Sequence, residues 1–283
     1  MDIKRIVSSV LGLPMVIIVI LFGNKYIIDI AMSIVAIISL HEYYNAVSKD
    51  SKPIKWLGYV TAALISLIHI INIENLYKIA ILMVPIIITI LFIQLIIDNM
   101  KHSFKDIAVS AFGIFYIVYF ISFIPLIAGT TDGKIYVWYA IIAAWGTDIF
   151  AYLVGKKIGK HKFSKISPKK SIEGCIAGVI GAVALAIIYT ACLNLFFNIV
   201  GISYIKVIII TAILSVISQF GDFAASSIKR SVGIKDFSNL IPGHGGLLDR
   251  IDSLIFVAPF AYILLDMMFI LGGKIWLSFW QMQ

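Results

Sequence analysis

Long runs of apolar residues recur along the whole chain, and short segments rich in charge, glycine, proline or asparagine separate them. A helical run of about 20 apolar residues is long enough to cross the hydrocarbon core of a bilayer, which is about 30 Å thick. The pattern therefore predicts an all-α, polytopic integral membrane protein with about nine transmembrane helices. These helices are expected at about 5–23, 25–43, 56–73, 79–97, 105–128, 135–155, 174–200, 204–228 and 252–272.

The composition agrees with this pattern. Of the 283 residues, 61% are hydrophobic and 13% are charged, whereas soluble domains have about 45–50% apolar and about 25% charged residues. Because so few charges cannot cover a surface in water, we exclude a soluble enzyme, a disordered chain, a secreted disulfide scaffold and a single-pass receptor. The first apolar run follows Lys4 and Arg5, as in a signal peptide. No small-x-small cleavage site closes it, so we expect a retained helix.

The distribution of lysine and arginine predicts the orientation of these helices. With the N-terminus in the cytoplasm and the C-terminus outside, 18 of the 23 basic residues fall on the cytoplasmic side. Cytoplasmic loops carry such an excess of positive charge. Topology and anionic lipid therefore account for the net charge of +8, and nucleic acid is not an expected partner.

The polar segments predict how the chain is organised. The two longest, 156–173 and 229–251, both fall on the cytoplasmic side, so we expect the chemistry there. We divide the chain into about five N-terminal membrane helices (1–130) and a C-terminal catalytic region (131–283). The catalytic region is expected to contain about four helices and the two cytoplasmic loops.

Ionisable side chains inside membrane helices cost at least ~2.5 kcal/mol at a helix centre and are functional candidates by default. Asp222 has polar neighbours at steps of three and four residues, so they share one face of its helix. This polar stripe consists of Ser215, Ser218, Gln219, Asp222, Ser226, Lys229 and Arg230. We predict that it lines a water-filled cavity open to the cytoplasm. Asp148 shares a face with Tyr152 and Lys156, where a functional and a structural role are equally supported.

Other polar residues of the membrane helices receive structural interpretations. Asp29 lies near the outer end of its helix and is expected to snorkel to the interface. Interfacial positions are also expected for His69 and for the pair His41 and Glu42, because all three lie near helix ends. Asp266 is assigned a structural or helix-pairing role.

The first long polar segment carries seven lysines and one glutamate between Lys156 and Gly174. It does not fit a Walker A loop, because Lys160 is followed by His161 rather than by serine or threonine. Lysines beside glycine, serine and proline nevertheless suit a polyphosphate, since ammonium groups and backbone N–H groups both attract anions. The alternative is a solvated loop whose positive charge serves orientation alone.

The second long polar segment turns sharply, because glycines lie on both sides of His244. Asp249 and Asp252 follow one helical turn apart at the start of the last helix. Asp249 alone fits an N-cap. Carboxylates with lysine and arginine nearby are also typical of Mg²⁺-dependent phosphoryl chemistry, so we favour that role.

These motifs resemble the phosphatidate cytidylyltransferase (CDP-diacylglycerol synthase) family of bacterial type. The positions that match its signature are Ser226, Lys229, Arg230, Lys235, Asp236, Ser238, Ile241, Pro242, His244, Gly245, Gly246, Leu247, Asp249, Arg250, Ile251 and Asp252. Three upstream segments also resemble the family: T-D-x-x-A-Y-x-x-G at Thr147–Gly155, S-P-K-K-S-x-E-G at Ser167–Gly174 and Q-x-G-D at Gln219–Asp222. Together the motifs cover about the C-terminal half of the chain.

The resemblance implies an enzyme that converts CTP and phosphatidate to CDP-diacylglycerol and pyrophosphate. It also implies a multi-pass protein of the inner (cytoplasmic) membrane and a homodimer. Its metal centre is expected to hold Mg²⁺ or Mn²⁺, beside a monovalent cation such as K⁺, through Asp222 and Asp249.

Other site residues follow from the same resemblance. Those expected to neutralise phosphate charge are Lys229, Arg230, Lys235 and Arg250. Those expected on the nucleotide side are Ser167, Lys169, Lys170, Ser171 and Glu173. Asp148 is expected to order the metal or a lysine, and His244 to donate to a phosphate or to shape its loop. The signature also includes Ser226, Asp236 and Asp252 in the site.

Two alternatives remain open at this point. The first is an enzyme that cytidylylates another lipid phosphate, such as that of an ether lipid, or a polyprenol kinase. The second is a secondary transporter or ion channel that uses Asp148 and Asp222. The sequence shows no convincing internal repeat, which gives the transporter no support.

Overall fold

The computed structural model describes residues 3–71, 73–99, 101–130, 132–164, 167, 170–197 and 202–265. Within these ranges the regular structure is helical, apart from two isolated β-bridges. The helices are α1 (Ile3–Phe22), α2 (Lys25–Val47), α3 (Lys55–Leu64), η1 (Ile65–Ile70), α4 (Ile73–Ile97), α5 (Phe104–Gly113), η2 (Ile114–Tyr119), α6 (Phe123–Ala128), α7 (Gly133–Ile141), η3 (Ile142–Gly146), α8 (Thr147–Ile158), α9 (Ile172–Phe197), α10 (Tyr204–Ser231) and α11 (Leu248–Leu265). The prediction of an all-α protein is confirmed.

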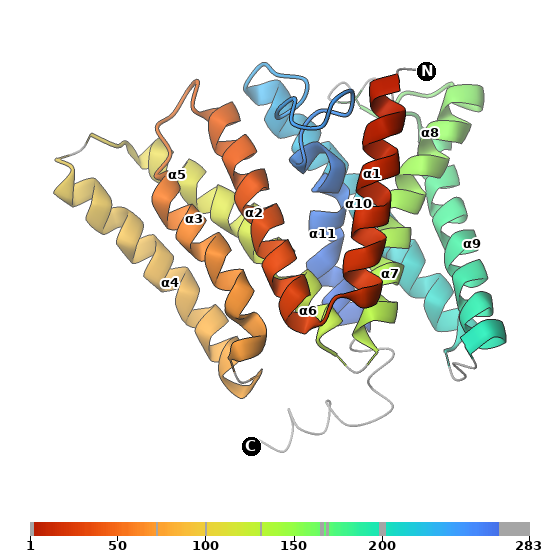
Figure 1. The fold of residues 1–283 in the computed structure, drawn as a ribbon. Helices are drawn as coiled ribbons and strands as arrows, with labels where there is room; N and C mark the ends of the chain where they lie inside the picture. Colours follow the sequence, from red (N-terminus) through yellow and green to blue (C-terminus); the bar gives the residue numbers. More distant parts are fainter. Residues whose placement is uncertain are drawn as a thin grey trace. The chain divides into compact units, whose positions relative to one another are not determined.

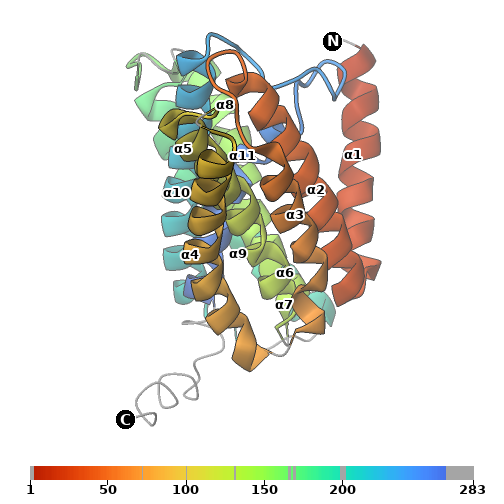
Figure 2. The same ribbon diagram turned by 90° about the vertical axis from the view of Figure 1, so that its left-hand side faces the viewer.

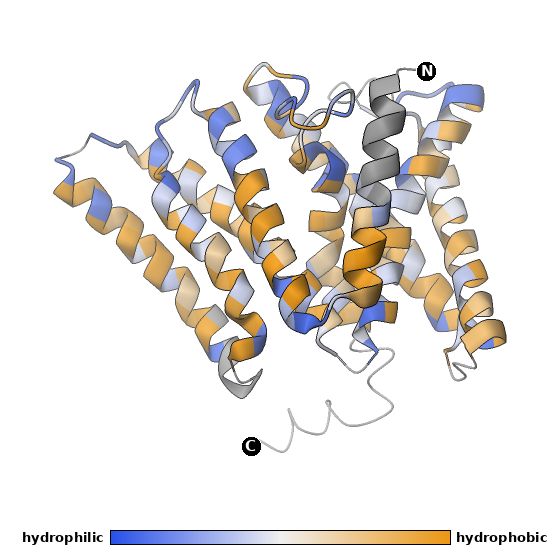
Figure 3. Cartoon of the chain, viewed as in Figure 1, coloured by the Kyte–Doolittle hydropathy of each residue, from blue (hydrophilic) through white to orange (hydrophobic). Residues whose placement is uncertain are grey.

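Five helical segments of the described chain are long and apolar enough to cross a membrane, judged by length and composition. They are Lys25–Val47, Phe104–Ala128, Gly133–Ile158, Ile172–Phe197 and Tyr204–Ser231. Figure 3 shows the corresponding pattern, in which hydrophobic residues predominate along the helices and hydrophilic residues gather at their ends and in the loops. These segments identify the chain as a helical membrane protein. Asp266 and the end of the last predicted helix lie outside the described residues.

The chain forms two compact units. The first unit comprises Met1–Lys134 and Ile228–Ile251, and the second comprises Ile135–Ser227 and Asp252–Gln283. The last turn of α10 and the first turn of α11 therefore belong to the first unit, whereas the longer parts of both helices belong to the second.

In the first unit, α2 packs against α3 and η1, and Figures 1 and 2 both show α2 and α3 side by side. Gly58 of α3 permits this close approach, because a Cβ atom there would lie 2.5 Å from the hydroxyl of Tyr44. Tyr44 is completely buried and donates a hydrogen bond to the Ser110 carbonyl of α5 (3.2 Å). The tyrosine thus links three helices of this unit.

Polar connections of the first unit gather at the end where α1 begins (Figure 1). This polar end consists of the segments 48–54 and 232–247 and the start of α5. Hydrogen bonds tie its parts together, since Lys52 N donates to Asp106 (2.5 Å) and Lys105 Nζ donates to the Asp50 carbonyl (2.8 Å). Asp106 also completes a capping box with Ser103, which fixes the start of α5.

Asp29 and His69 are paired inside the first unit. Asp29 is completely buried, and its carboxylate accepts a hydrogen bond from the backbone N–H of His69 (3.1 Å). The other carboxylate oxygen lies 2.7 Å from Nδ1 of the same histidine. The expectation that Asp29 snorkels to the interface is therefore wrong, and the interfacial position of His69 stays a prediction. Each side chain instead provides the polar partner that the other needs once water is excluded.

In the second unit, α8 packs along α9 through glycines. A Cβ atom at Gly181 would lie 2.1 Å from the ring of Phe150, and one at Gly178 would lie 2.9 Å from the carbonyl oxygen of Thr147. Small residues of this kind let membrane helices approach closely, and van der Waals packing then holds them together.

Candidate functional site

The signature segment of the first unit folds into a tight turn between α10 and α11. Gly243 and Gly245 have φ angles of +78° and +86°, in the left-handed region that glycine tolerates best. Ile241 N donates to the carbonyl of Gly245 (2.8 Å) and closes the turn. The predicted sharp turn around His244 is confirmed.

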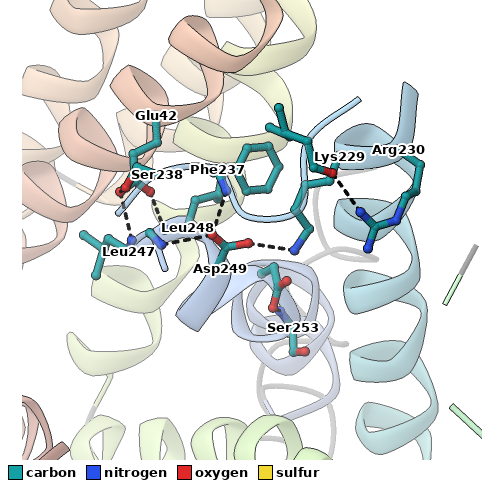
Figure 4. A network of polar contacts seen from close by, with 12 residues as sticks. Glu42, Lys229, Arg230, Phe237, Ser238, Leu247, Leu248, Asp249 and Ser253 are labelled. Atoms are coloured by element: carbon teal, nitrogen blue, oxygen red, sulfur yellow. Dashed lines mark hydrogen bonds and ion pairs between the residues drawn. The ribbon is translucent and has the colours of Figure 1, made fainter. Parts of the chain in front are cut away.

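The turn and the start of α11 surround the carboxylate of Asp249 (Figure 4). Its Oδ1 accepts a hydrogen bond from Lys229 Nζ (2.7 Å), and its Oδ2 accepts from the backbone N–H groups of Phe237 (2.8 Å) and Gly246 (3.0 Å). Only 2% of the Asp249 side chain and 10% of the Lys229 side chain are exposed. A buried carboxylate needs such partners, because an unpaired charge away from water is costly.

A second buried carboxylate, that of Glu42 in α2, binds the same turn (Figure 4). Its Oε1 accepts hydrogen bonds from Ser238 Oγ (2.5 Å) and Leu247 N (2.9 Å), and its Oε2 accepts from Leu248 N (2.7 Å). The neighbouring His41 is exposed, but Glu42 is only 4% exposed. Glu42 therefore satisfies N–H groups that the start of α11 leaves without a helical partner, and its interfacial position stays a prediction.

The remaining charged signature residues of the first unit are exposed. They are Arg230, Lys235, Asp236 and Arg250. Arg230 Nη1 donates to the Ile234 carbonyl just beyond α10 (2.8 Å). His244 is half-buried in the turn, and its backbone N–H donates to the Ile241 carbonyl (2.9 Å). The three exposed cations are accessible to an anion from solvent.

In the second unit, Asp222 of α10 forms an ion pair with Lys170, which precedes α9. Lys170 Nζ also lies 4.7 Å from the ring centroid of Phe223, and Phe163 stacks on Phe223 with 4.7 Å between centroids. About a fifth of each charged side chain is exposed, 23% for Asp222 and 20% for Lys170. A predicted metal ligand and a predicted nucleotide-binding lysine are thus brought together.

Two other residues predicted for the nucleotide side, Ser171 and Glu173, make hydrogen bonds at the start of α9. Ser171 Oγ accepts a hydrogen bond from the N–H group three residues further on (3.2 Å), as the N-cap of α9. Glu173 Oε1 lies 2.6 Å from His161 Nδ1 and also accepts from the His161 backbone N–H (3.2 Å). Ser167 is half-buried, and Lys169 lies outside the described residues.

The polar stripe of α10 begins as a contact between helices of the second unit. Ser215 Oγ lies 2.5 Å from Thr147 Oγ1, and Ser218 Oγ donates to a carbonyl of η3 (3.4 Å). Both serines are completely buried, so the prediction that they line a water-filled cavity is wrong. Gln219 Nε2 donates to the Cys175 carbonyl of α9 (3.1 Å). The next two residues of the stripe, Gln219 and Asp222, are partly exposed.

Two further predicted carboxylates of the second unit meet at Ser253 of α11. Asp148 Oδ2 accepts a hydrogen bond from Ser253 Oγ (3.1 Å), and the buried Asp252 accepts from Ser253 N (2.8 Å). Ser226 is buried on α10. Asp148 therefore contributes a helix–helix hydrogen bond, which is the structural role that its position in the sequence left open.

The carboxylates of Asp222 and Asp249 have the chemistry that a divalent cation requires. Among the described residues, no group of three or more His, Cys, Asp and Glu side chains forms a metal cage. Mg²⁺ seldom needs one, because it is commonly held by one or two carboxylates together with substrate phosphates and water. Each of these aspartates offers hard oxygen donors and is balanced by a lysine within its own unit.

Comparison with known proteins gives a consistent result. The sequence profile of the cytidylyltransferase family matches residues 3–268. The phosphatidate cytidylyltransferase of Bacillus subtilis is 46% identical over 134 residues, which cover 47% of this chain and 48% of that protein. Those of Staphylococcus haemolyticus and Thermotoga maritima are 38% identical over 174 residues and 35% identical over 167 residues.

The coverage of these relatives is partial. The match spans 61% of this chain and 64% of the Staphylococcus haemolyticus protein, and 58% of this chain and 60% of the Thermotoga maritima protein. The chain thus matches between about half and just under two thirds of the length of these curated relatives. The family profile, in contrast, extends over nearly the whole sequence, and on this ground the chain belongs to the cytidylyltransferase family.

Proposed function

We propose that this chain transfers the cytidylyl group of CTP to phosphatidate and releases CDP-diacylglycerol and pyrophosphate. One observation carries the proposal: the first unit brings three separate parts of the signature to one carboxylate. Lys229, Phe237 and Gly246 all donate hydrogen bonds to Asp249. Family membership and the names of the relatives support the same activity.

The reaction is a displacement at phosphorus. A phosphate oxygen of phosphatidate attacks the α-phosphorus of CTP, and the bond from that phosphorus to the bridging oxygen of the β-phosphate breaks. Such transfers need little covalent chemistry from a protein, mainly positioning and neutralisation of charge. The exposed Arg230, Lys235 and Arg250 are suited to neutralise phosphatidate or the departing pyrophosphate.

The cofactors are part of the proposal. The proposed ligands of Mg²⁺ or Mn²⁺ are Asp222 and Asp249, and a monovalent cation such as K⁺ is proposed beside the divalent cation. When bound, the divalent cation would supply positive charge that favours attack by the phosphate of phosphatidate and departure of pyrophosphate. The residues predicted to bind the nucleotide are still Ser167, Lys169, Lys170, Ser171 and Glu173. The contact of Glu173 with His161 and the N-cap of Ser171 support this role, because both lie beside Lys170 at the start of α9.

The membrane arrangement is also proposed. We retain nine membrane-spanning helices, a cytoplasmic N-terminus, a cavity open to the cytoplasm, a location in the inner membrane and a homodimer. We also retain the division into an N-terminal membrane region and a C-terminal catalytic region. The polar end of the first unit supports the orientation, because the predicted cytoplasmic segments 48–54 and 232–247 lie at the end where α1 begins.

The test is incorporation of labelled CTP into lipid by the purified protein in detergent with Mg²⁺. We expect label in CDP-diacylglycerol when phosphatidate is supplied and none when phosphatidate or Mg²⁺ is omitted. For phosphatidate and its ether-linked analogue the label is in the cytidine moiety of CTP. Polyprenol is tested in parallel with CTP labelled at the γ-phosphate, because a kinase transfers that phosphate and not the cytidylyl group. Label that enters only one of these lipids would replace phosphatidate as the proposed acceptor, and absence of label with every lipid would refute cytidylyl transfer.

A further inference from the structure

We propose that Glu42 is a positioning residue for Asp249, which it holds in place through the turn between α10 and α11. This inference rests on the proposed function, in which Asp249 takes part in the reaction. Glu42 lies on α2, and its partners Leu247 and Leu248 are 205 and 206 residues away in the sequence. The contact is therefore tertiary, and Glu42 itself lies outside the signature segment.

The start of α11 requires an acceptor at this place. The first N–H groups of a helix have no partner within the helix, and the positive end of the helix dipole favours a carboxylate. Leu248 is the first residue of α11, and its N–H group and that of Leu247 each bind one oxygen of Glu42. A bidentate carboxylate fixes both the position of the helix start and its direction.

The two buried carboxylates divide the donors of the turn between them. Of three successive amides, that of Gly246 binds Asp249, and those of Leu247 and Leu248 bind Glu42. Earlier in the turn, Phe237 N also binds Asp249, and the next residue, Ser238, binds Glu42 through its hydroxyl (Figure 4). Any displacement of Glu42 therefore moves residues that are directly bonded to the donors of Asp249.

Gly246 provides independent support for this division. A Cβ atom at this position would lie 2.7 Å from Oε2 of Glu42 and 2.9 Å from both Cδ and Oε1. The missing side chain therefore makes room for one carboxylate, while the amide of the same residue binds Asp249 (3.0 Å). The approach of Glu42 therefore favours a glycine at 246, although the φ angle of this residue makes no such demand.

The surroundings of Glu42 make a substitution informative. Glu42, Phe237 and Ser238 border a cavity of about 680 Å³ in the first unit, together with Ile38 and Tyr59. Glu42→Gln has nearly the same size, so it does not overpack the site. Its amide group, however, donates where an acceptor is needed, and one of the two amides at the start of α11 loses its partner.

The experiment compares Glu42→Gln with Asp29→Asn, a matched control on the same helix. Asp29 is also a buried carboxylate that accepts a backbone hydrogen bond, but its partner is His69 and it has no part in the proposed site. Amide hydrogen exchange is measured over 237–249. The kcat and the KM for CTP are measured on equal amounts of folded wild-type and variant protein. We expect faster exchange over 237–249 in Glu42→Gln alone. Its kcat should fall about ten- to hundredfold, since a misplacement of about 1 Å can cost about a hundredfold in rate.

A second variant guards against a failure of Glu42→Gln to fold. Ser238→Ala removes one donor to Glu42 and leaves the carboxylate in place, so we expect faster exchange over 237–249 and a two- to fivefold lower kcat (an order-of-magnitude expectation). Unchanged exchange in both variants overturns the inference, as does unchanged kcat where exchange has increased. An equal loss of kcat in Asp29→Asn would mean that Glu42 contributes only to general stability, and this result also overturns the inference. If the wild-type protein transfers no cytidylyl group, the proposed function fails, and the exchange data still decide whether Glu42 orders the turn.

Discussion

The charge of Asp249 is balanced by one ammonium group and two backbone amides. Taking both ions of such a pair out of water is expensive, and the attraction between them repays that cost only when their hydrogen bonds are well made. Removal of one partner leaves the other charge buried without compensation. A single substitution in the pair of Lys229 and Asp249 should therefore lower the free energy of unfolding more than a double substitution that removes both charges.

We expect Lys229→Met to lower the free energy of unfolding by about 3–5 kcal/mol, the usual cost of leaving one partner of a buried ion pair alone. The double variant Lys229→Met with Asp249→Leu should recover part of this loss, because both charges are gone. Thermal unfolding of the purified proteins in detergent measures the difference. A double variant that is less stable than the single one would show that the pair itself stabilises the fold.

Asp222 is a different case, because its ion pair with Lys170 is partly exposed. Partly exposed pairs contribute little to stability, so Asp222→Asn should leave insertion and thermal unfolding nearly unchanged. If Asp222 binds the divalent cation, turnover should fall by at least about a hundredfold, the order of loss seen when a group that stabilises transition-state charge is removed. Lipid labelling from CTP, measured beside a gel-filtration profile, tests both parts. Normal turnover would remove Asp222 from the metal site.

Motifs predicted some of these residues and missed others for a physical reason. Asp249 and Lys229 stand out because their types and spacing follow a signature. Glu42 lies in a different helix, and only the folded chain reveals that the start of α11 takes its acceptor from there. The contact between Asp29 and His69 also escapes prediction, because the positions of the two residues in the sequence do not indicate that they meet.

The helices themselves were easier to predict than their ends. Apolar runs mark a membrane helix, but the polar turns that extend it carry no hydropathy signal. For this reason α2, expected to end near residue 43, continues to Val47, and α4, expected from 79, begins at Ile73. The extra turn of α2 supports the proposed role of Glu42, because a helix that continues beyond this residue holds it as a fixed acceptor.

Packing between α8 and α9 depends on the absence of side chains at particular glycines. We expect Gly181→Ala to lower the free energy of unfolding by about 1–3 kcal/mol, the usual cost of overpacking, since its Cβ atom would lie 2.1 Å from the Phe150 ring. Gly12→Ala in α1 is the control, because no atom lies within 4 Å of a Cβ there and alanine favours a helix. Thermal unfolding compares the two. Equal stability would indicate that Phe150 moves aside at little cost.

At the scale of the whole molecule, orientation in the membrane decides which substrates reach the site. In the proposed reaction the nucleotide is CTP, which is soluble and charged, so the turn around Asp249 must face the compartment that supplies it. Within the first unit, this turn lies at the polar end, where α1 begins. Lys134, at the start of α7, donates instead to the carbonyl of Leu21 near the other end of α1 (3.0 Å). In the proposed arrangement, in which α1 crosses the membrane, its two ends lie on opposite sides.

This orientation predicts which positions a membrane-impermeant thiol reagent reaches. In a background with Cys175 and Cys192 replaced by serine, Ser51→Cys places a thiol at the polar end, and Asp132→Cys places one just before α7. With the polar end in the cytoplasm, intact cells should be labelled at position 132 only, and permeabilised cells at both positions. Labelling of position 51 in intact cells would place the polar end outside. The site around Asp249 would then face away from the CTP of the cytoplasm. This result would contradict the proposed reaction.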